Sequence, residues 1–111
     1  MNSVLSFARA MSAALFCCSQ PVIAQDLEGL TWREQKCVLY GRAVETAVAS
    51  IGKDGLRENF LADNLAFIDG GCQGKGNICP VTGAEIEFAN LLTVLTMNEG
   101  MASTFVPFNC P

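Results

Sequence analysis

Residues 72–79 read CQGKGNIC and join two apolar stretches of the chain. Two cysteines that flank a glycine-rich loop suggest a metal site, a redox site, a phosphate site or a disulfide anchor. A zinc site usually contains a close cysteine pair or a histidine, but six residues separate these cysteines and the chain has no histidine. The loop also lacks the Cys-x-x-Cys spacing of redox sites and the full P-loop pattern. We therefore expect disulfide-bonded cysteines, with no metal and no cofactor.

The first 24 residues are predicted to be a cleavable signal peptide. Arg9 is followed by an apolar run over 10–18, by Pro21 and by the small residue Ala24, which is the order of a secretory signal. The apolar run is about half the ~20 residues that a membrane span needs. A buried N-terminal helix and a lipid-modified Cys17 or Cys18 are the alternatives. Cleavage would leave residues 25–111 as one domain, in the bacterial periplasm or outside the cell.

Cleavage also changes the charge and the number of cysteines. Loss of Arg9 leaves six basic and eleven acidic residues, so the net charge moves from −4 to −5. An even number of cysteines in a small exported chain indicates a disulfide framework. The cysteines that remain are Cys37, Cys72, Cys79 and Cys110. The acidic balance argues against nucleic acids and anionic membrane surfaces as partners, and no stable membrane insertion is expected after the signal is removed.

Helical periodicity dominates the mature chain and predicts an all-α fold. Apolar residues recur at spacings of three, four and seven, and glycines interrupt the pattern. The helices are expected at 28–51, 55–69 and 83–100. Thr31 with Glu34, and Thr82 with Glu85, match the capping box of a helix start. The sequence thus predicts an up-down-up three-helix bundle with an extended apolar C-terminal tail, and the wide apolar arc of the third helix suggests that this helix is central.

Helix lengths predict where the cysteines lie. At about 1.5 Å per residue, Cys37 and Cys72 lie at similar heights from the first turn, and Cys79 is expected at the same end of the bundle. The nine residues before Cys110 can return along the third helix if they are extended. The favoured disulfides are Cys37–Cys72 and Cys79–Cys110. The pairing Cys37–Cys79 with Cys72–Cys110 is almost equally reachable. The third possibility is a local Cys72–Cys79 bond together with Cys37–Cys110.

Several observations argue against an enzyme. The usual general base near neutral pH is missing because the chain has no histidine. Ser50 and Ser103 have no activating partner in the sequence. The carboxylates of Glu85 and Glu87, and those of Asp63 and Asp69, are spaced so that they point in different directions on their helices. We therefore expect no catalytic residues.

The aromatic residues Trp32, Phe105 and Phe108 are the candidates for partner binding, because aromatic side chains dominate binding hot spots. The alternative is that Trp32 covers the cysteines and that the tail completes a small core. If the tail is docked, at least one phenylalanine should be buried against the third helix near Leu91 or Leu95.

These features together favour an exported, acidic, non-enzymatic protein that binds another protein, as inhibitors, immunity proteins and adaptors do. We expect the partner to be a protein, whose identity the sequence does not give. The sequence does not determine the oligomeric state either. One alternative is an envelope protein that protects against stress or acts as a chaperone. Another is a secreted effector that acts on another cell.

Overall fold

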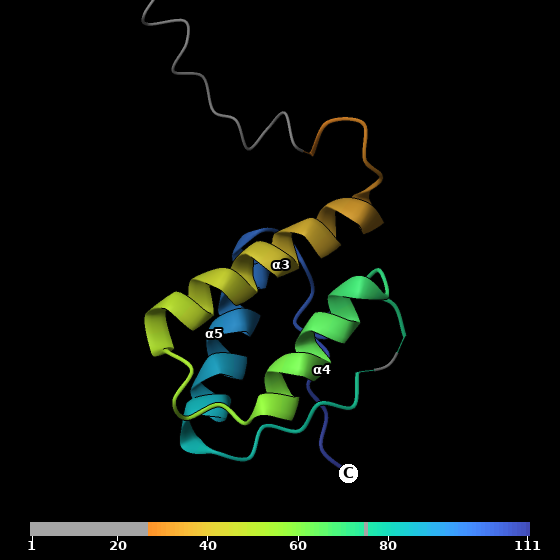
Figure 1. Ribbon diagram of the computed structural model, residues 1–111. Coiled ribbons are helices and arrows are strands. Elements are labelled where there is room, and N and C mark those ends of the chain that lie inside the picture. Colours follow the sequence, from red (N-terminus) through yellow and green to blue (C-terminus); the bar gives the residue numbers. More distant parts are fainter. Residues whose placement is uncertain (1–26, 75) are drawn as a thin grey trace, which may run out of the picture.

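The computed structural model describes residues 27–74 and 76–111, which fold into three α-helices (Figure 1). The predicted signal peptide, with Cys17 and Cys18, and Lys75 lie outside the described residues. The helices are α3 (Trp32–Ile51), α4 (Glu58–Asp69) and α5 (Gly83–Asn98). The described residues contain no extended strand, only an isolated bridge between Ile78 and Phe108. The expected all-α, three-helix bundle with two disulfides is confirmed.

Both predicted capping boxes are present and set where two helices begin. Thr31 Oγ1 accepts from the Glu34 amide at 3.2 Å, and Glu34 Oε1 accepts from the Thr31 amide at 2.9 Å. Thr31 is thus the N-cap of the first helix and has an extended backbone. The helix therefore begins at Trp32 and not at residue 28. The second helix begins at Glu58, three residues later than predicted, after a turn that buries Leu56.

The helix directions follow from contacts at the two ends of the bundle. Thr82, the N-cap of α5, donates its hydroxyl to the Gly55 carbonyl at 2.6 Å, so α5 begins beside the α3–α4 turn. At its other end, a Cβ built on Gly100 would lie 3.9 Å from the ring of Trp32, at the start of α3. Therefore α3 is antiparallel to α5, and the short turn makes it antiparallel to α4 as well (Figure 1).

The central helix is α3, and not the third helix as predicted. It packs on both α4 and α5, and it contributes the buried residues Tyr40, Ala43, Val44 and Ala47. The wide apolar arc of α5 is only partly covered, since Ile86, Val94 and Met97 are about half exposed. Between α4 and α5, Phe60 meets Phe88 edge to face with ring centroids 5.5 Å apart.

The core contains one buried polar pair. Tyr40 donates its hydroxyl to Asn64 Oδ1 at 2.6 Å, and Asn64 Nδ2 donates to the Phe60 carbonyl at 2.9 Å. Tyr40 and Asn64 are both fully buried. Burial raises the pKa of the Tyr40 hydroxyl, which therefore stays a neutral donor.

Replacement of Tyr40 by Phe should destabilise the protein. The change leaves Asn64 Oδ1 buried without its hydrogen-bond donor, which costs about 1–3 kcal/mol. Urea unfolding with intact disulfides measures the loss. A double variant with Tyr40→Phe and Asn64→Leu should recover part of it, because both polar partners are then removed. Equal stability of Tyr40→Phe and the parent would contradict the role given to this pair.

The disulfides are Cys37–Cys72 and Cys79–Cys110, with Cα atoms 5.4 and 4.6 Å apart, as the favoured pairing predicted. Their expected gathering at one end is wrong. Cys72 follows the C-terminal end of α4, whereas the Cys79 carbonyl accepts from Nη2 of Arg57, just before the N-terminal end, at 3.1 Å. The seven steps from Cys72 to Cys79, at about 3.3 Å each, are long enough to return along α4.

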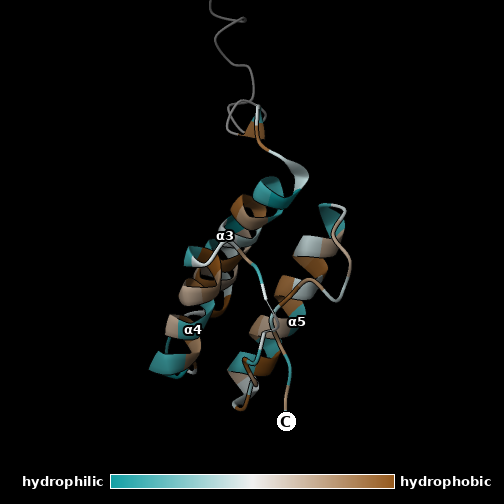
Figure 2. Ribbon diagram, turned by 90° about the vertical axis from the view of Figure 1, so that its right-hand side faces the viewer, coloured by the Kyte–Doolittle hydropathy of each residue, from teal (hydrophilic) through white to brown (hydrophobic). Residues whose placement is uncertain are grey.

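The C-terminal tail is docked and pairs with the segment that precedes Cys79. The Ile78 amide donates to the Pro107 carbonyl at 3.1 Å, and the Asn109 amide donates to the Ile78 carbonyl at 3.0 Å. Met101 and Pro107 are buried. A Cβ at Gly76 would overlap Pro107, so this close approach requires glycine. The tail thus runs between α4 and α5, as Figures 1 and 2 show from two directions.

Candidate functional site

Two of the three predicted aromatic residues lie beside one cation. Lys36 Nζ is 5.9 Å from the ring centroid of Trp32 and 5.1 Å from that of Phe105. Trp32 is the first residue of α3 and is 48% exposed, while Phe105 is half-buried. Lys36 therefore links an accessible ring to a ring of the core, through contacts of the cation–π kind.

The two phenylalanines of the tail pack against other rings and complete the core. Phe105 meets Tyr40 and Phe67 edge to face, with centroids 6.0 and 6.2 Å away. Phe108 stacks on Phe60 with centroids 6.0 Å apart and an angle of 14° between the planes. Phe108 also lines a hollow with Ala89 and Asn90 of α5, and burial of a tail phenylalanine near Leu91 or Leu95 stays a prediction.

Trp32 and Phe108 therefore belong to different parts of the molecule and do not form one surface. Trp32 remains accessible, and its role in partner binding stays a prediction. Both phenylalanines have packing contacts that account for their presence in the tail.

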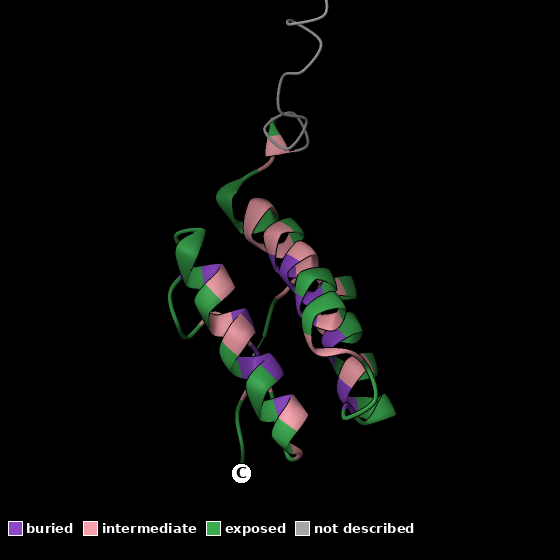
Figure 3. Ribbon diagram, turned by 90° about the vertical axis from the view of Figure 1, so that its left-hand side faces the viewer, coloured by how far each residue is buried: buried purple, intermediate pink, exposed green. Residues whose placement is uncertain are grey.

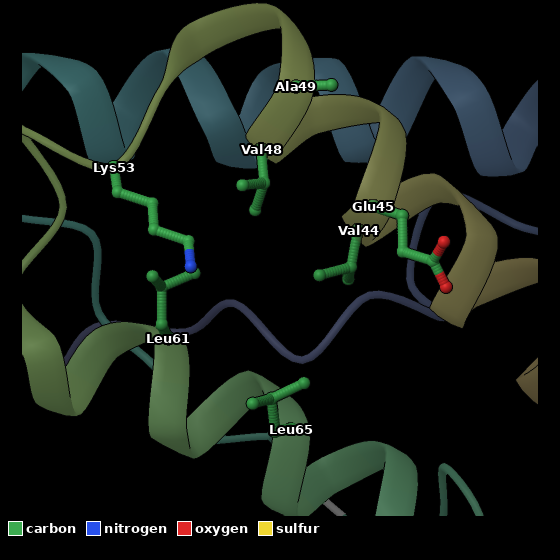
Figure 4. Close-up of a pocket in the computed structure, with 7 residues that line it drawn as sticks. All are labelled: Val44, Glu45, Val48, Ala49, Lys53, Leu61 and Leu65. Atoms are coloured by element: carbon green, nitrogen blue, oxygen red, sulfur yellow. The ribbon is translucent and has the colours of Figure 1, made fainter.

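A more extensive apolar site lies between α3 and α4. We call it the α3–α4 groove; it is an open cavity of about 360 Å³ lined by Val44, Glu45, Val48, Ala49, Lys53, Leu61 and Leu65. In Figure 4 the four valine and leucine side chains converge from the two helices; the tail passes behind them, and α5 lies behind α3. Leu65 is 55% exposed, so its side chain is accessible from solvent along this groove.

Local sequence explains why this groove is open. Val44 and Val48 are one turn apart on α3, and Leu61 and Leu65 are one turn apart on α4. Phe60 fills the interior of the bundle. Of the four groove residues, Val44 is buried, Val48 and Leu61 are half-buried and Leu65 is exposed. The apolar spacing of α4 places Leu65 on one face with Phe60, Leu61 and Ile68, yet Leu65 is exposed. Asn64 is buried beside it instead, so the inward face of α4 is turned by one residue.

The two ends of the groove carry opposite charges. Lys53 lies at one end, beyond Leu61, and Glu45 lies at the other, beside Val44 (Figure 4). Both side chains belong to exposed residues. The groove is thus an apolar channel between a cation and an anion, a pattern that suits a partner with an apolar face and charged ends.

Glu85 forms a second polar centre, which is structural. It is fully buried, and its carboxylate accepts from Nε and Nη2 of Arg57, each at 2.9 Å, and from the backbone amides of Arg57 and Val81 at 2.7 and 2.9 Å. Hydrogen bonds from Arg57, aided by the backbone amides, lower the pKa of Glu85 to about 2 despite its burial. Capping by Glu85 was predicted, but its pairing with Arg57 was missed.

This centre joins three parts of the chain, and both oxygens of the Glu85 carboxylate accept hydrogen bonds in it. Arg57 precedes α4, Glu85 belongs to the first turn of α5, and Arg57 also holds the Cys79 carbonyl. A carboxylate that accepts this many hydrogen bonds is strongly held in its ionised form. We therefore assign the pair to the joining of α4, α5 and the second disulfide.

Over residues 27–74 and 76–111, no three His, Cys, Asp or Glu side chains gather closely enough to hold a metal ion. Within the same residues, no helix combines the length and the apolar character that crossing a membrane requires. No protein-family model matches the chain, and comparisons with curated proteins and with solved structures found no significant match.

Proposed function

We propose that this protein is a non-enzymatic exported protein that binds an amphipathic helix of another protein in the α3–α4 groove. The observation that carries the proposal is the apolar channel of Val44, Val48, Leu61 and Leu65 between Lys53 and Glu45. Binding of one apolar helix face in a hydrophobic groove is a common mode of peptide recognition.

The size and the charges of the groove define the partner segment. The six steps from Glu45 to Ile51 at the end of α3 span about 9 Å, and Lys53 lies two residues beyond, in the turn, so the groove matches roughly two helical turns. A helix of that length presents apolar side chains at positions i, i+3 or i+4, and i+7. Its positive N-terminal end is favoured beside Glu45, and its negative C-terminal end beside Lys53. The bound helix would therefore run parallel to α3.

The compartment follows from the disulfides. Two disulfides in a small domain are typical of oxidising, exported environments. We propose the bacterial periplasm or the extracellular space, and a role of the inhibitor, immunity or adaptor type. A rigid frame with disulfides suits this role because little ordering is needed when the partner binds.

A displayed library of peptides of about 14 residues, with variable apolar positions on one helical face, tests the groove directly. We expect enriched peptides to bind the wild-type protein and to lose at least about tenfold in affinity with Leu65→Glu, equivalent to about 1.4 kcal/mol. Ala62→Glu is the matched control, because Ala62 is an exposed residue of α4 outside the groove. This variant should bind like the wild type.

Two results would overturn the proposal. One is a library that yields no binder at micromolar concentrations. The other is a set of peptides whose affinity is the same for Leu65→Glu and the wild type. Broad binding of unfolded proteins without a preferred pattern would instead support the chaperone alternative.

A further inference from the structure

A cationic hollow lies beside the Cys37–Cys72 disulfide. It has a volume of about 280 Å³ and is lined by Arg33, Lys36, Cys72, Gln73, Gly74 and Phe105. Both cations belong to the first two turns of α3, which are green and pink in Figure 3, the colours of exposed and intermediate residues. The hollow is thus open to a small molecule, and a disulfide cysteine forms part of its wall.

The positive charge of this hollow is not balanced by a carboxylate. Within the part of the chain that the structure describes, no Asp or Glu forms an ion pair with Arg33 or Lys36. Lys36 Nζ lies 5.1 Å from the ring centroid of Phe105, a contact that leaves its charge in place. The neighbouring Glu34 is engaged in the cap of α3. On an acidic chain, two such cations around one hollow attract an anionic ligand.

The second disulfide has an uncharged hollow beside it. Cys110 lines a hollow of about 520 Å³, and none of the described residues around that hollow carries an ionisable side chain. Arg57 contacts the Cys79 carbonyl at 3.1 Å, but the Glu85 carboxylate balances its charge. Cys110 is exposed and Cys72 is half-buried. The two disulfides therefore differ in the charge that an approaching molecule meets, and access alone does not favour the first.

The backbone at Cys72 favours opening of the first disulfide. Among the described residues, Cys72 is the one non-glycine residue with a positive φ, at +58°. This left-handed conformation is unfavourable for a residue with a Cβ atom. Cys72 is held there by its amide, which donates to the Phe67 carbonyl at 2.9 Å, and by its bond to Cys37. Breakage of the disulfide removes one of these constraints, so relaxation of the backbone favours the open form.

From these observations we propose that the hollow is a binding and exchange site for a small thiol that carries a carboxylate. Arg33 and Lys36 bind the carboxylate, and the thiolate sulfur forms a bond with Sγ of Cys72. The bond between Cys72 and Cys37 breaks, and its electron pair leaves with Sγ of Cys37. The Cys37 thiolate takes up a proton from water, which replaces the proton that the small thiol lost. The product is a mixed disulfide at Cys72 and a free thiol at Cys37.

The chemistry of this exchange requires no Cys-x-x-Cys motif. The attacking thiolate comes from the small molecule, and the fold itself brings Cys37 and Cys72 together with Cα atoms 5.4 Å apart. Positive charge acts twice: it concentrates the anionic thiol in the hollow, and it favours the thiolate form of a nearby thiol. The site should therefore prefer a thiol with a carboxylate to a neutral thiol of similar size.

Initial rates of disulfide opening by 3-mercaptopropionate and by the neutral 2-mercaptoethanol test this preference. Acid quenching, alkylation and peptide mapping by mass spectrometry follow each disulfide of the mature protein separately. The ratio of the mercaptopropionate rate to the mercaptoethanol rate should be at least about threefold higher at Cys37–Cys72 than at Cys79–Cys110. Differences in intrinsic thiol reactivity cancel, because both disulfides meet the same two thiols. The mixed disulfide should map to Cys72.

The double variant Arg33→Gln, Lys36→Gln should lower the ratio at Cys37–Cys72 to about that at Cys79–Cys110. About 1 M salt should lower the wild-type ratio in the same direction. Ser50→Glu, Ala62→Glu is the matched control, because it makes the same change in net charge at exposed positions outside the hollow; its ratio should equal that of the wild type. Circular dichroism confirms that each variant is folded.

Three results would each overturn the proposal. The first is an equal ratio of the two rates at both disulfides of the wild type. The second is a ratio at Cys37–Cys72 that Arg33→Gln, Lys36→Gln leaves unchanged. The third is a mixed disulfide that forms on Cys37 and not on Cys72.

Discussion

Replacement of Glu85 by Gln should destabilise the protein substantially at neutral pH. The change removes the charge that pairs with Arg57 and places an amide where several N–H donors converge. The Arg57 side chain is 42% exposed and stays hydrated, so the loss is that of hydrogen bonds to a buried charged group, about 1.5–3 kcal/mol. The whole stability of a domain is about 5–15 kcal/mol, and small domains lie at the low end. Urea unfolding with intact disulfides measures the loss.

The same variant should alter how stability depends on pH. Hydrogen bonds from Arg57 and from backbone amides lower the pKa of Glu85 from 4.5 to about 2. A carboxyl whose pKa is lower in the folded state stabilises the fold fully above its unfolded value, and this contribution falls as pH drops toward the folded value. The wild type should therefore lose this stability between about pH 4.5 and pH 2, and Glu85→Gln should lack this part of the loss.

Glu87→Gln provides the control for both measurements. Glu87 is exposed and lies two residues further along α5, so its replacement removes the same charge without the buried contacts. Its stability at neutral pH should stay within about 0.5 kcal/mol of the wild type. If Glu85→Gln and the wild type lost stability in parallel between about pH 4.5 and pH 2, the role of the Arg57–Glu85 pair would be wrong.

Loss of the Cys79–Cys110 bond should free the tail as well as lower stability. The two disulfides close loops of similar length, with sequence separations of 31 and 35. Loop entropy therefore predicts nearly the same loss for each, within the usual range of about 2–5 kcal/mol. Of the two disulfides, Cys79–Cys110 is the one that attaches the tail, and Phe108 of the tail stacks on Phe60. The Cys79→Ser, Cys110→Ser variant should thus be the less stable of the two double variants.

Hydrogen exchange separates tail release from general destabilisation. The amides of Ile78 and Asn109 bond across the segment that the tail covers. They should exchange much faster in Cys79→Ser, Cys110→Ser, while helix amides keep their protection under folding conditions. In Cys37→Ser, Cys72→Ser the same two amides should stay protected. Retained protection at Ile78 and Asn109 after loss of Cys79–Cys110 would show that the tail docks without its disulfide.

The local features of the fold were predictable because they depend on near neighbours in the sequence. The capping boxes at Thr31 and Thr82 involve residues three positions apart, and both are present. The favoured disulfide pairing is present, although helix lengths left the exchanged pairing almost equally reachable and wrongly placed all four cysteines at one end. The first helix ends at Ile51 as expected, and Gly52 caps it with a φ of +86°.

The longer-range features were not predictable for a physical reason. The return of residues 72–79 along α4 depends on pairing between Ile78 and the tail, which are far apart in sequence. The Arg57–Glu85 pair likewise joins residues 28 positions apart. The α3–α4 groove depends on a rotation of α4 that buries Asn64 and exposes Leu65. Apolar periodicity alone does not determine whether the side of α4 that carries Leu65 or the adjacent side that carries Asn64 faces the core.

The α3–α4 groove is tested most directly by site-specific photo-crosslinking in the native compartment of the protein. A photoreactive residue at position 65 should crosslink to one partner, and mass spectrometry should map the bond to the apolar face of a helix in that partner. The same residue at position 62, on the exposed side of α4, should not give this product. Crosslinking to the same proteins from both positions, or to no protein from position 65, would contradict binding in the groove.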